Sequence, residues 1–242
     1  MFSNQLLFLM TVIGMAVAEV PSYIHVCGRK DPKLDECVIN SVKSLRDKLR
    51  DGIPELDIPP VEPLKMSKVE LIDTPSFKAT ATDIILRGLL TYHVNFLHVD
   101  LKKQQIDIDV YFEENKLDAH FNITAQILVP IVGKGPISLV AKNVAAKANL
   151  NFKLVDHAGK KYVFFPSMTT NLDVKNYDLK FEAENFDNSL HDAISQALGN
   201  SRQEILDAVK PNLEKVISET VLSMANKIGK HFTYDELLPD RE

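Results

Sequence analysis

The sequence predicts an α+β fold in which a strongly curved antiparallel β-sheet wraps one long C-terminal helix. Between about Met66 and Phe186, apolar and polar residues alternate, which is the period of strands with one buried face. Between Ser201 and Phe232, apolar residues instead recur at helical spacing. A single amphipathic helix that follows a run of long amphipathic strands has to bury its apolar side against them, and long strands curl because twist accumulates along them.

Residues 1–18 have the features of a secretory signal. They contain no charged side chain, an apolar run from Leu6 to Val17, and Ala16 and Ala18 at the spacing of a cleavage site. About twelve apolar residues would cross only about 18 Å of a roughly 30 Å hydrocarbon core, so a membrane anchor is the weaker interpretation. We therefore expect a secreted protein that begins at Glu19 and has no stable membrane insertion.

The two cysteines, Cys27 and Cys37, both follow the expected cleavage site. An even number of cysteines in an exported chain indicates a disulfide. A reactive thiol pair is the alternative, which the spacing and the oxidising compartment disfavour.

The chain then predicts a helix from Asp35 to Arg50, ended by Gly52 and Pro54. The following segment, GIPELDIPPVEPL, has four prolines and should be a rigid, non-helical connector. Because its other residues are largely apolar, we expect it to lie against the body of the protein.

The strands follow from the alternation. The pattern predicts two strands, at residues 106–112 and 117–127, and EENK at 113–116 predicts a hairpin turn between them. Further strands cover residues 146–154, 162–164, 172–174 and 177–183, with a turn at DHAGKK.

Two helices close the chain. Asn188 or Ser189 can cap a short helix that stops at Gly199. Ser201 and Glu204 have the spacing of a capping box for the last helix, in which Pro211 predicts a kink or a break.

No catalytic signature is found in the sequence, which has no G-x-S-x-G, H-E-x-x-H, G-x-x-x-x-G-K-[ST] or C-x-x-C motif. The seven histidines are scattered, and the five-residue separation of His93 and His98 should put them on opposite faces of a strand. The formal net charge is −5 and no dense block of Lys or Arg occurs, so nucleic acid and anionic membrane are poor first choices as partners. We expect no enzyme activity, no cofactor and no metal.

Two polar features of the predicted strands are candidate sites. Asp107 and Asp109, with Glu113 and Glu114, form an acidic patch that we interpret as a solvated outer face, since no glycine-containing loop organises the oxygens. Asn122 begins an N-I-T glycosylation sequon and should point outward.

The inward side of the predicted sheet leaves two interpretations open. A fully packed core is the simpler one. A long curled sheet around one helix need not close completely, and an apolar tunnel would suit a small hydrophobic ligand. In that case the alternation predicts the following lining residues: Ile108, Val110, Phe112, Ala119, Phe121, Ile123, Phe152, Phe164, Met168, Leu172, Val209, Leu213 and Val216.

Several segments in order resemble one protein family. They are the early pair Cys27 and Cys37, the GIPELDIPPVEPL connector, the stretch NFDNSLHDAISQALGNSRQEILDAVKP, and the ending FTYDELLP. Together they resemble the takeout and juvenile-hormone-binding protein family of insects. The hormone-carrier branch typically has a second disulfide, for which this chain has no cysteines left, so the takeout-like branch is favoured.

The resemblance implies one domain over residues 19–242, a super-roll similar to half of the bactericidal permeability-increasing protein, and a disulfide between the two cysteines. It further implies secretion into haemolymph or another extracellular fluid and carriage of a lipophilic small molecule, such as a juvenile-hormone-like terpenoid, a fatty acid or another long-chain lipid. We expect a monomer, and a cell-surface receptor is a further partner to consider. The alternatives are a secreted esterase or isomerase acting on such a lipid, and a surface-recognition protein for lipids.

Overall fold

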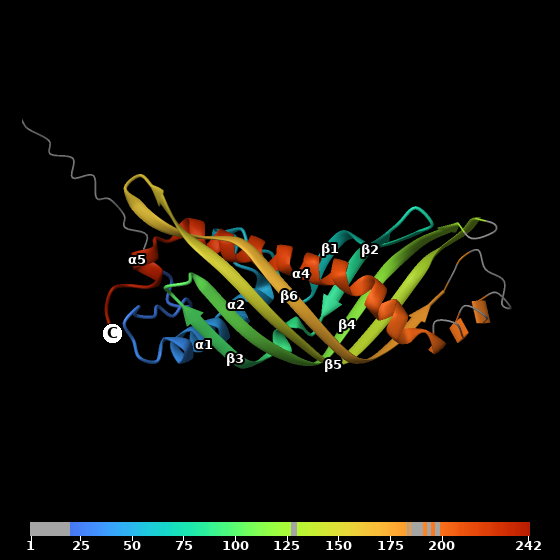
Figure 1. Cartoon of the computed structure of the whole chain (residues 1–242), viewed down its shortest axis with the longest axis horizontal. Helices are drawn as coiled ribbons and strands as arrows, with labels where there is room; N and C mark the ends of the chain where they lie inside the picture. The colour runs from blue at the N-terminus through green and yellow to red at the C-terminus, as the bar shows by residue number, and fades with distance from the viewer. Residues whose placement is uncertain (1–19, 127–129, 183, 185–190, 193–194, 197–198) are drawn as a thin grey trace, which may run out of the picture.

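The computed structural model describes residues 20–126, 130–182, 184, 191–192, 195–196 and 199–242. The predicted signal and most of the predicted helix from 188 to 199 lie outside these residues. The predicted fold is confirmed: a curved antiparallel sheet lies along one long helix, α4 (Figure 1). Among the residues described, no helix is long and apolar enough to span a bilayer.

The N-terminal region packs as a cap at one end of the sheet. The single helix predicted from Asp35 to Arg50 is two helices, α1 (Leu34–Ser44) and α2 (Arg46–Asp51). The connector lies against the body as predicted, with Ile53, Leu56 and Ile58 all buried. It is not wholly non-helical, because Pro54–Leu56 forms the short 3-10 helix η1.

Six antiparallel strands form the sheet: β1 (Leu64–Asp73), β2 (Phe77–Arg87), β3 (His93–Asp100), β4 (Gln105–Gln126), β5 (Pro130–His157) and β6 (Lys160–Phe181). A second 3-10 helix, η2 (Leu89–Thr91), joins β2 to β3. The order is β1-β2-β4-β5-β6. β3 pairs with the first half of β4 and β2 with its second half, so two shorter strands share one side of a long one.

The predicted hairpin turn at EENK is wrong, because β4 continues through it. Glu114 pairs with Lys142 and Asn115 with Ala141, without a shift in register. The alternation nevertheless inverts here. Val110 lies in the same row as the buried Leu172 and therefore faces inward, and Ala119 also faces inward, because it packs near Val216 of α4. Two residues at an odd separation in an unbroken strand would lie on opposite faces. On β5 the inversion coincides with Asn143, whose φ is 55°. A local break in alternation looks the same in sequence whether the chain turns back or only exchanges its two faces.

The helix α4 (Arg202–His231) is continuous over 30 residues with Pro211 inside it, so the predicted break does not occur. The predicted capping box at Ser201 does not form either, since the Ser201 side chain makes no cap hydrogen bond. A capping box is present further on, where Thr233 and Glu236 bond reciprocally at the start of α5 (Tyr234–Leu237).

The helix covers the free edge of β6. The Phe165 N–H donates to Asn226 Oδ1 (2.8 Å), and Asn226 Nδ2 donates back to the Phe165 carbonyl (2.9 Å). The Leu172 N–H donates to Glu214 Oε1 at 2.8 Å. These side chains satisfy backbone groups that an edge strand would otherwise leave unpaired.

The same helix reaches the opposite edge of the sheet. Asn212 Nδ2 donates to the Leu71 carbonyl of β1 at 2.8 Å. The close contacts of α4 with the sheet are concentrated on β6 and β1, which are the two ends of the strand order. The helix therefore bridges the two edges of the curved sheet and closes it along one side.

Candidate functional site

The candidate site is the space between α4 and the concave face of the sheet. Lys215 and Glu219 lie on the solvent side of α4 and approach each other at 3.9 Å. The opposite, apolar side lies between the contact to β1 and the contact to β6, and it carries Val209, Leu213 and Val216. All three are only half-buried, although the helix and the sheet enclose them.

The floor of this space is made of rows that run across three strands. Ile108 of β4 pairs with Ala148 of β5, which pairs with Thr170 of β6. The next row is Val110, Ala146 and Leu172. Because β5 contributes only alanine to both rows, no large side chain rises from the middle of the floor towards α4.

Many of the buried apolar residues form three packed clusters in the described part of the chain. The end cluster contains Ile24, Ile53, Leu56, Ile58 and Phe232. Phe152, Val163 and Tyr234 form a second. The third contains Val69, Ala81, Ile84 and Ala119. Other buried apolar residues, among them Phe121, Val144 and Leu172, lie outside these clusters, and half-buried inward-facing residues such as Val110 and Leu213 lie among them.

The predicted lining residues differ in burial. Ala119, Phe121, Phe152 and Leu172 are buried. The half-buried ones are Ile108, Val110, Phe112, Ile123, Met168, Val209, Leu213 and Val216.

Phe164 is misplaced by the sequence prediction: it is 45% exposed, while its neighbours Val163 and Phe165 pack inward. The pairing of β5 with β6 shifts register between Asn151 and Lys153, opposite Pro166. Proline cannot donate to the ladder and often accompanies such irregularities. The alternation that runs through Met168 and Leu172 is inverted beyond this point, which puts Phe164 on the outer face.

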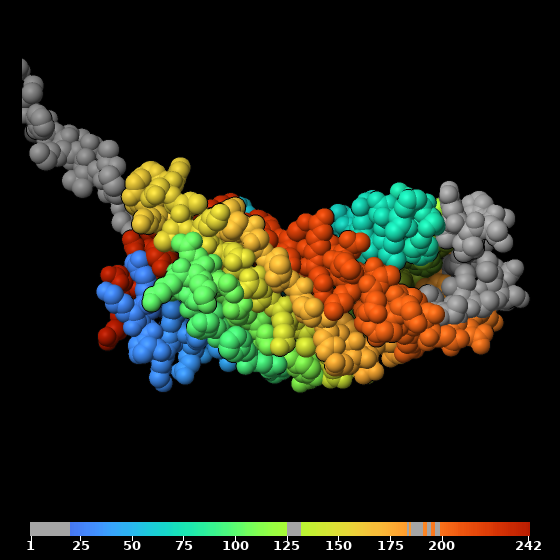
Figure 2. All heavy atoms as spheres, in the orientation of Figure 1, coloured from blue at the N-terminus to red at the C-terminus, as the bar shows by residue number. Residues whose placement is uncertain are grey.

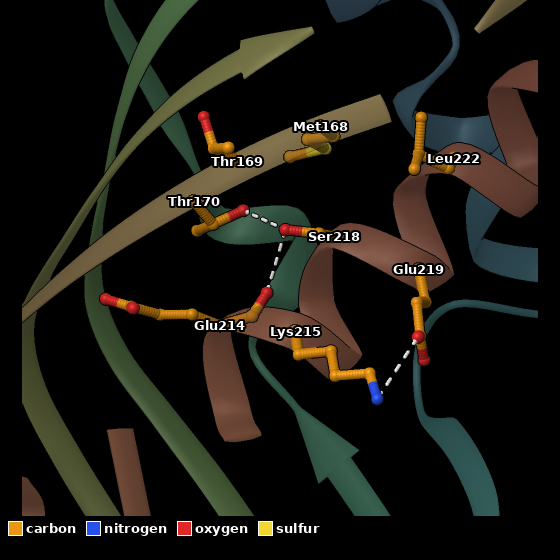
Figure 3. A pocket seen from close by; sticks show the side chains of 8 residues that line it. All are labelled: Met168, Thr169, Thr170, Glu214, Lys215, Ser218, Glu219 and Leu222. Atoms are coloured by element: carbon orange, nitrogen blue, oxygen red, sulfur yellow. Dashed lines mark hydrogen bonds and ion pairs between the residues drawn. The ribbon is translucent and has the colours of Figure 1, made fainter. Parts of the chain in front are cut away.

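A groove of about 350 Å³ opens between β6 and α4 (Figure 3). Met168 and Leu222 form part of its wall, and Thr170 and Ser218 are joined by a hydrogen bond of 2.8 Å between their hydroxyls. The Ser218 hydroxyl also donates to the Glu214 carbonyl at 2.8 Å. Sequence reasoning missed this polar pair, because a serine and a threonine within apolar patterns give no sign that they meet.

A second pocket, of about 260 Å³, lies where β6 ends and α4 begins. Tyr177, Phe181, His191 and Arg202 are among its lining residues. The Phe181 ring packs edge-on against Phe121 at 5.9 Å and lies 4.9 Å from the His191 ring. The pocket is thus aromatic on the side next to the concave face.

Most of the perturbed ionisable groups in the described part of the chain lie away from the concave face; the exception is Tyr177, which lines the second pocket and whose pKa is raised by burial. Burial, followed by a hydrogen bond to Glu55, raises the pKa of Tyr23 to about 12. Burial raises the pKa of Tyr92. The hydrogen bond to Asp35, at 2.9 Å, raises the pKa of His98. The concave face offers apolar contact area and hydroxyls rather than a tuned acid or base.

The two histidines of β3 correct another prediction. His93 and His98 pair with Tyr111 and Asp107, both on the outer face, because the register shifts between Val94 and Phe96. They therefore share a face instead of lying on opposite ones. Among the described residues there is still no group of His, Cys, Asp or Glu that could hold a metal.

The other polar features lie on the outer face. Asp109 pairs with Lys147 at 3.3 Å, and Asp107 accepts a hydrogen bond from Asn149 at 2.6 Å. Asn122 is exposed within the paired part of β4.

The predicted disulfide is present, with Cys27 and Cys37 joined and their Cα atoms 5.8 Å apart. The C-terminal tail packs on the loop that this disulfide closes. The Arg29 guanidinium stacks on the Tyr234 ring at 4.5 Å and pairs with Asp235, while the Arg29 N–H donates to the Pro239 carbonyl. Two segments singled out in the sequence, the cysteine loop and FTYDELLP, thus form one structural unit.

Comparison with known proteins identifies one family and a solved structure with the same fold. The family model described as haemolymph juvenile hormone binding protein matches residues 6–239. A putative beta-carotene-binding protein from Schistocerca gregaria is 22% identical over 228 residues, which cover 90% of this chain and 89% of that protein. The structure of Takeout 1 from Epiphyas postvittana aligns with a TM-score of 0.75 and 20% identity, over 89% of this chain and 99% of that one. Members of the matched family are non-enzymatic carriers of lipophilic ligands, which excludes the esterase or isomerase alternative.

Proposed function

Because the chain belongs to the haemolymph juvenile hormone binding protein family, we propose that it is a secreted carrier that holds a lipophilic molecule between α4 and the concave face of the sheet. The ligand would be a long-chain or terpenoid lipid whose apolar body lies over the floor formed by Ala146 and Ala148. The tunnel and its lining, without Phe164, are part of this proposal.

One observation carries the proposal: apolar residues that face inward keep accessible surface. Val209, Leu213 and Val216 are half-buried although α4 bridges both edges of the sheet. In a close-packed core such side chains would be almost fully buried. Accessible apolar surface in an enclosed position is the condition for taking up a hydrophobic ligand.

Partition from water is sufficient to explain binding. Each buried methylene contributes about 0.8 kcal/mol, so a ten-carbon chain offers about 8 kcal/mol before the costs of association. Micromolar affinity is then within reach with few polar contacts. The hydroxyls of Thr170 and Ser218 already bond to each other, so they do not by themselves require a polar ligand.

The proposal is tested by filling the floor. We expect Ala148→Phe to weaken binding of a fluorescent fatty-acid probe at least about tenfold, because the new ring would occupy the space above β5. Lys147→Phe is the matched control, since Lys147 is the adjacent, exposed residue on the outer face. Equal affinity of both variants and the unchanged protein would contradict the proposed site.

Solvent extraction of protein from its native source, followed by mass spectrometry, identifies the ligand.

We also propose that residues 1–18 are removed on secretion, that the mature protein is a single-domain monomer, and that Asn122 is glycosylated. The exposed position of Asn122 supports a glycan, and its place within a paired strand lowers the expected occupancy. Intact-mass measurement of secreted protein before and after treatment with a glycosidase checks both modifications. Light scattering checks the oligomeric state.

A further inference from the structure

We propose that the β5–β6 hairpin, residues 153–164, is a docking surface for anionic phospholipid bilayers. The hairpin projects beyond the body at the end of the molecule that carries α5 (Figures 1 and 2). The net charge of −5 made an anionic membrane a poor expectation for the whole chain, but the charge of the hairpin is opposite, because its sequence KLVDHAGKKYVF contains three lysines and one aspartate. The inference rests on the proposed function, because a carrier of lipids has to exchange its ligand with membranes.

Apolar side chains are exposed on the outer face of this hairpin. Val155 is 41% and Phe164 45% exposed, and they are two of the four most exposed large apolar residues in the described part of the chain. Val155 pairs with Tyr162, and Phe164 pairs with Lys153, so these side chains are neighbours on one face. Grouped apolar exposure next to charged residues marks an interaction surface more often than a single exposed residue does.

The lysines of the hairpin are available for an external partner. Lys153, Lys160 and Lys161 are exposed, and none of them forms an ion pair with another described residue. The acid of the hairpin is Asp156. By contrast, outer-face lysines elsewhere on the sheet, such as Lys147, are paired with carboxylates.

The neighbouring β3–β4 turn extends the basic surface. The Phe152 N–H donates to the Gln104 carbonyl at 2.8 Å, which holds this turn beside the base of the hairpin. The turn contributes Lys102 and Lys103, and Asp100 pairs with Lys103 at 3.1 Å.

A bilayer fits this surface better than a folded protein does. A stable protein interface needs about 800 Å² on each partner, which a narrow projecting hairpin with a few exposed apolar side chains does not supply. Aromatic and aliphatic side chains flanked by lysine are instead the arrangement found at the boundary between headgroups and acyl chains. Lysines near such a surface are attracted by anionic lipid.

The test is co-sedimentation of the mature protein with 100 nm vesicles of phosphatidylcholine, with or without about 30% phosphatidylserine. We expect at least about tenfold tighter binding to the anionic vesicles, weakened by raising the salt concentration because screening shortens the range of attraction. The double variant Lys160→Glu, Lys161→Glu should lose this preference. Val155→Ser with Phe164→Ser should weaken binding about fivefold at either salt concentration.

Matched controls separate the hairpin from the rest of the surface. Lys43→Glu with Lys65→Glu makes the same change in net charge at exposed residues that have no ion pair among the described residues, and Phe96→Ser removes another exposed ring. Both controls should bind anionic vesicles within twofold of the unchanged protein. Equal binding to both vesicle types, an equal loss in the controls, or binding to cell membranes but not to protein-free vesicles would overturn the proposal.

A second measurement keeps this inference distinct from the carrier proposal. The hairpin variants should bind the fluorescent fatty-acid probe in vesicle-free solution as the unchanged protein does. If neither the unchanged protein nor the hairpin variants bind the probe, the carrier proposal fails, while the vesicle measurement still tests the docking surface. If only vesicle binding is absent, the carrier proposal stands and the docking surface does not.

Discussion

The two halves of α4 are held against the sheet in different ways. In the C-terminal half, the buried Gly229 lies against the backbone of β6, and Asn226 makes two hydrogen bonds to Phe165. Met224 and Ile228 are half-buried, like Val209, Leu213 and Val216, but they pack on the end cluster, which includes Phe232. In the N-terminal half, Asn212 and Glu214 each make one hydrogen bond to an edge strand, Arg202 and Tyr177 of β6 are joined by two more, and the apolar side is half-buried.

The difference separates stability from binding. The C-terminal half is anchored by close packing, the disulfide loop and the tail, so it fixes the position of the helix. The N-terminal half is joined by hydrogen bonds to both edges of the sheet, and among its half-buried apolar residues Val216 packs on a buried cluster whereas Val209 and Leu213 belong to none. A helix that were packed equally along its whole length would leave no room for a ligand.

The largest expected effect on stability comes from truncating Phe232 of the end cluster, compared with truncating Leu213 in the N-terminal half of α4. Phe232→Ala should lower the free energy of unfolding by about 4 kcal/mol, because it removes a buried ring from the end cluster. Leu213→Ala should lower it by only about 1 kcal/mol, since a half-buried side chain has less contact to lose. Urea unfolding of ligand-free protein, followed by circular dichroism, measures both. Equal losses would mean that the two halves are equally packed.

A smaller effect is expected where α4 approaches β6. A Cβ at Gly229 would lie 2.4 Å from the Val163 carbonyl oxygen, so the two backbones would have to separate. We expect Gly229→Val to lower the free energy of unfolding by about 2 to 3 kcal/mol. Gly199→Ala is the control, because a Cβ there meets nothing within 4 Å. An unchanged stability of the Gly229 variant would show that the anchored half can shift without cost.

The smallest effect concerns the ion pair that joins α1 to β3 at the anchored end. The pKa of His98 is raised, chiefly by its hydrogen bond to Asp35. A raised pKa of histidine contributes stability that is fully present below its unfolded value, about 6.5, and is lost as the pH rises through the folded value. His98→Gln should therefore destabilise the protein more at pH 5.5 than at pH 8.5.

The His98 effect is measured as the difference in unfolding free energy between variant and unchanged protein at the two pH values. His25→Gln serves as the control, because His25 is exposed and forms no ion pair within the described chain. A difference for His98→Gln that does not change with pH would show that the pair is too solvated to matter.

Much of the fold could be predicted because its signals are local. The alternation of β4 predicted inward residues correctly on both sides of Glu113 and Glu114, and the helical spacing predicted α4 with its apolar side. Of the predicted lining, Ala119, Phe121, Phe152 and Leu172 are buried and Phe164 is exposed, while the tunnel that they would line stays a prediction. The mistakes in the strands lie where the alternation inverts: at Asn143 and its partners in β4, near Pro166, and between His93 and His98.

By itself the sequence determined that a run of alternating strands is followed by one long helix, that its two cysteines pair, and which residues alternate together within a strand, because each depends on near neighbours or on composition. Only the tertiary structure decided which strand lies beside which, that EENK continues a strand, and that Thr170 meets Ser218. An inversion of faces is visible only in the pairing with the partner strand, because a break in alternation has the same sequence pattern as a turn. The surface that stays accessible is likewise set by how far α4 is held from the sheet, which the contacts at Gly229, Asn226, Glu214 and Asn212 fix together.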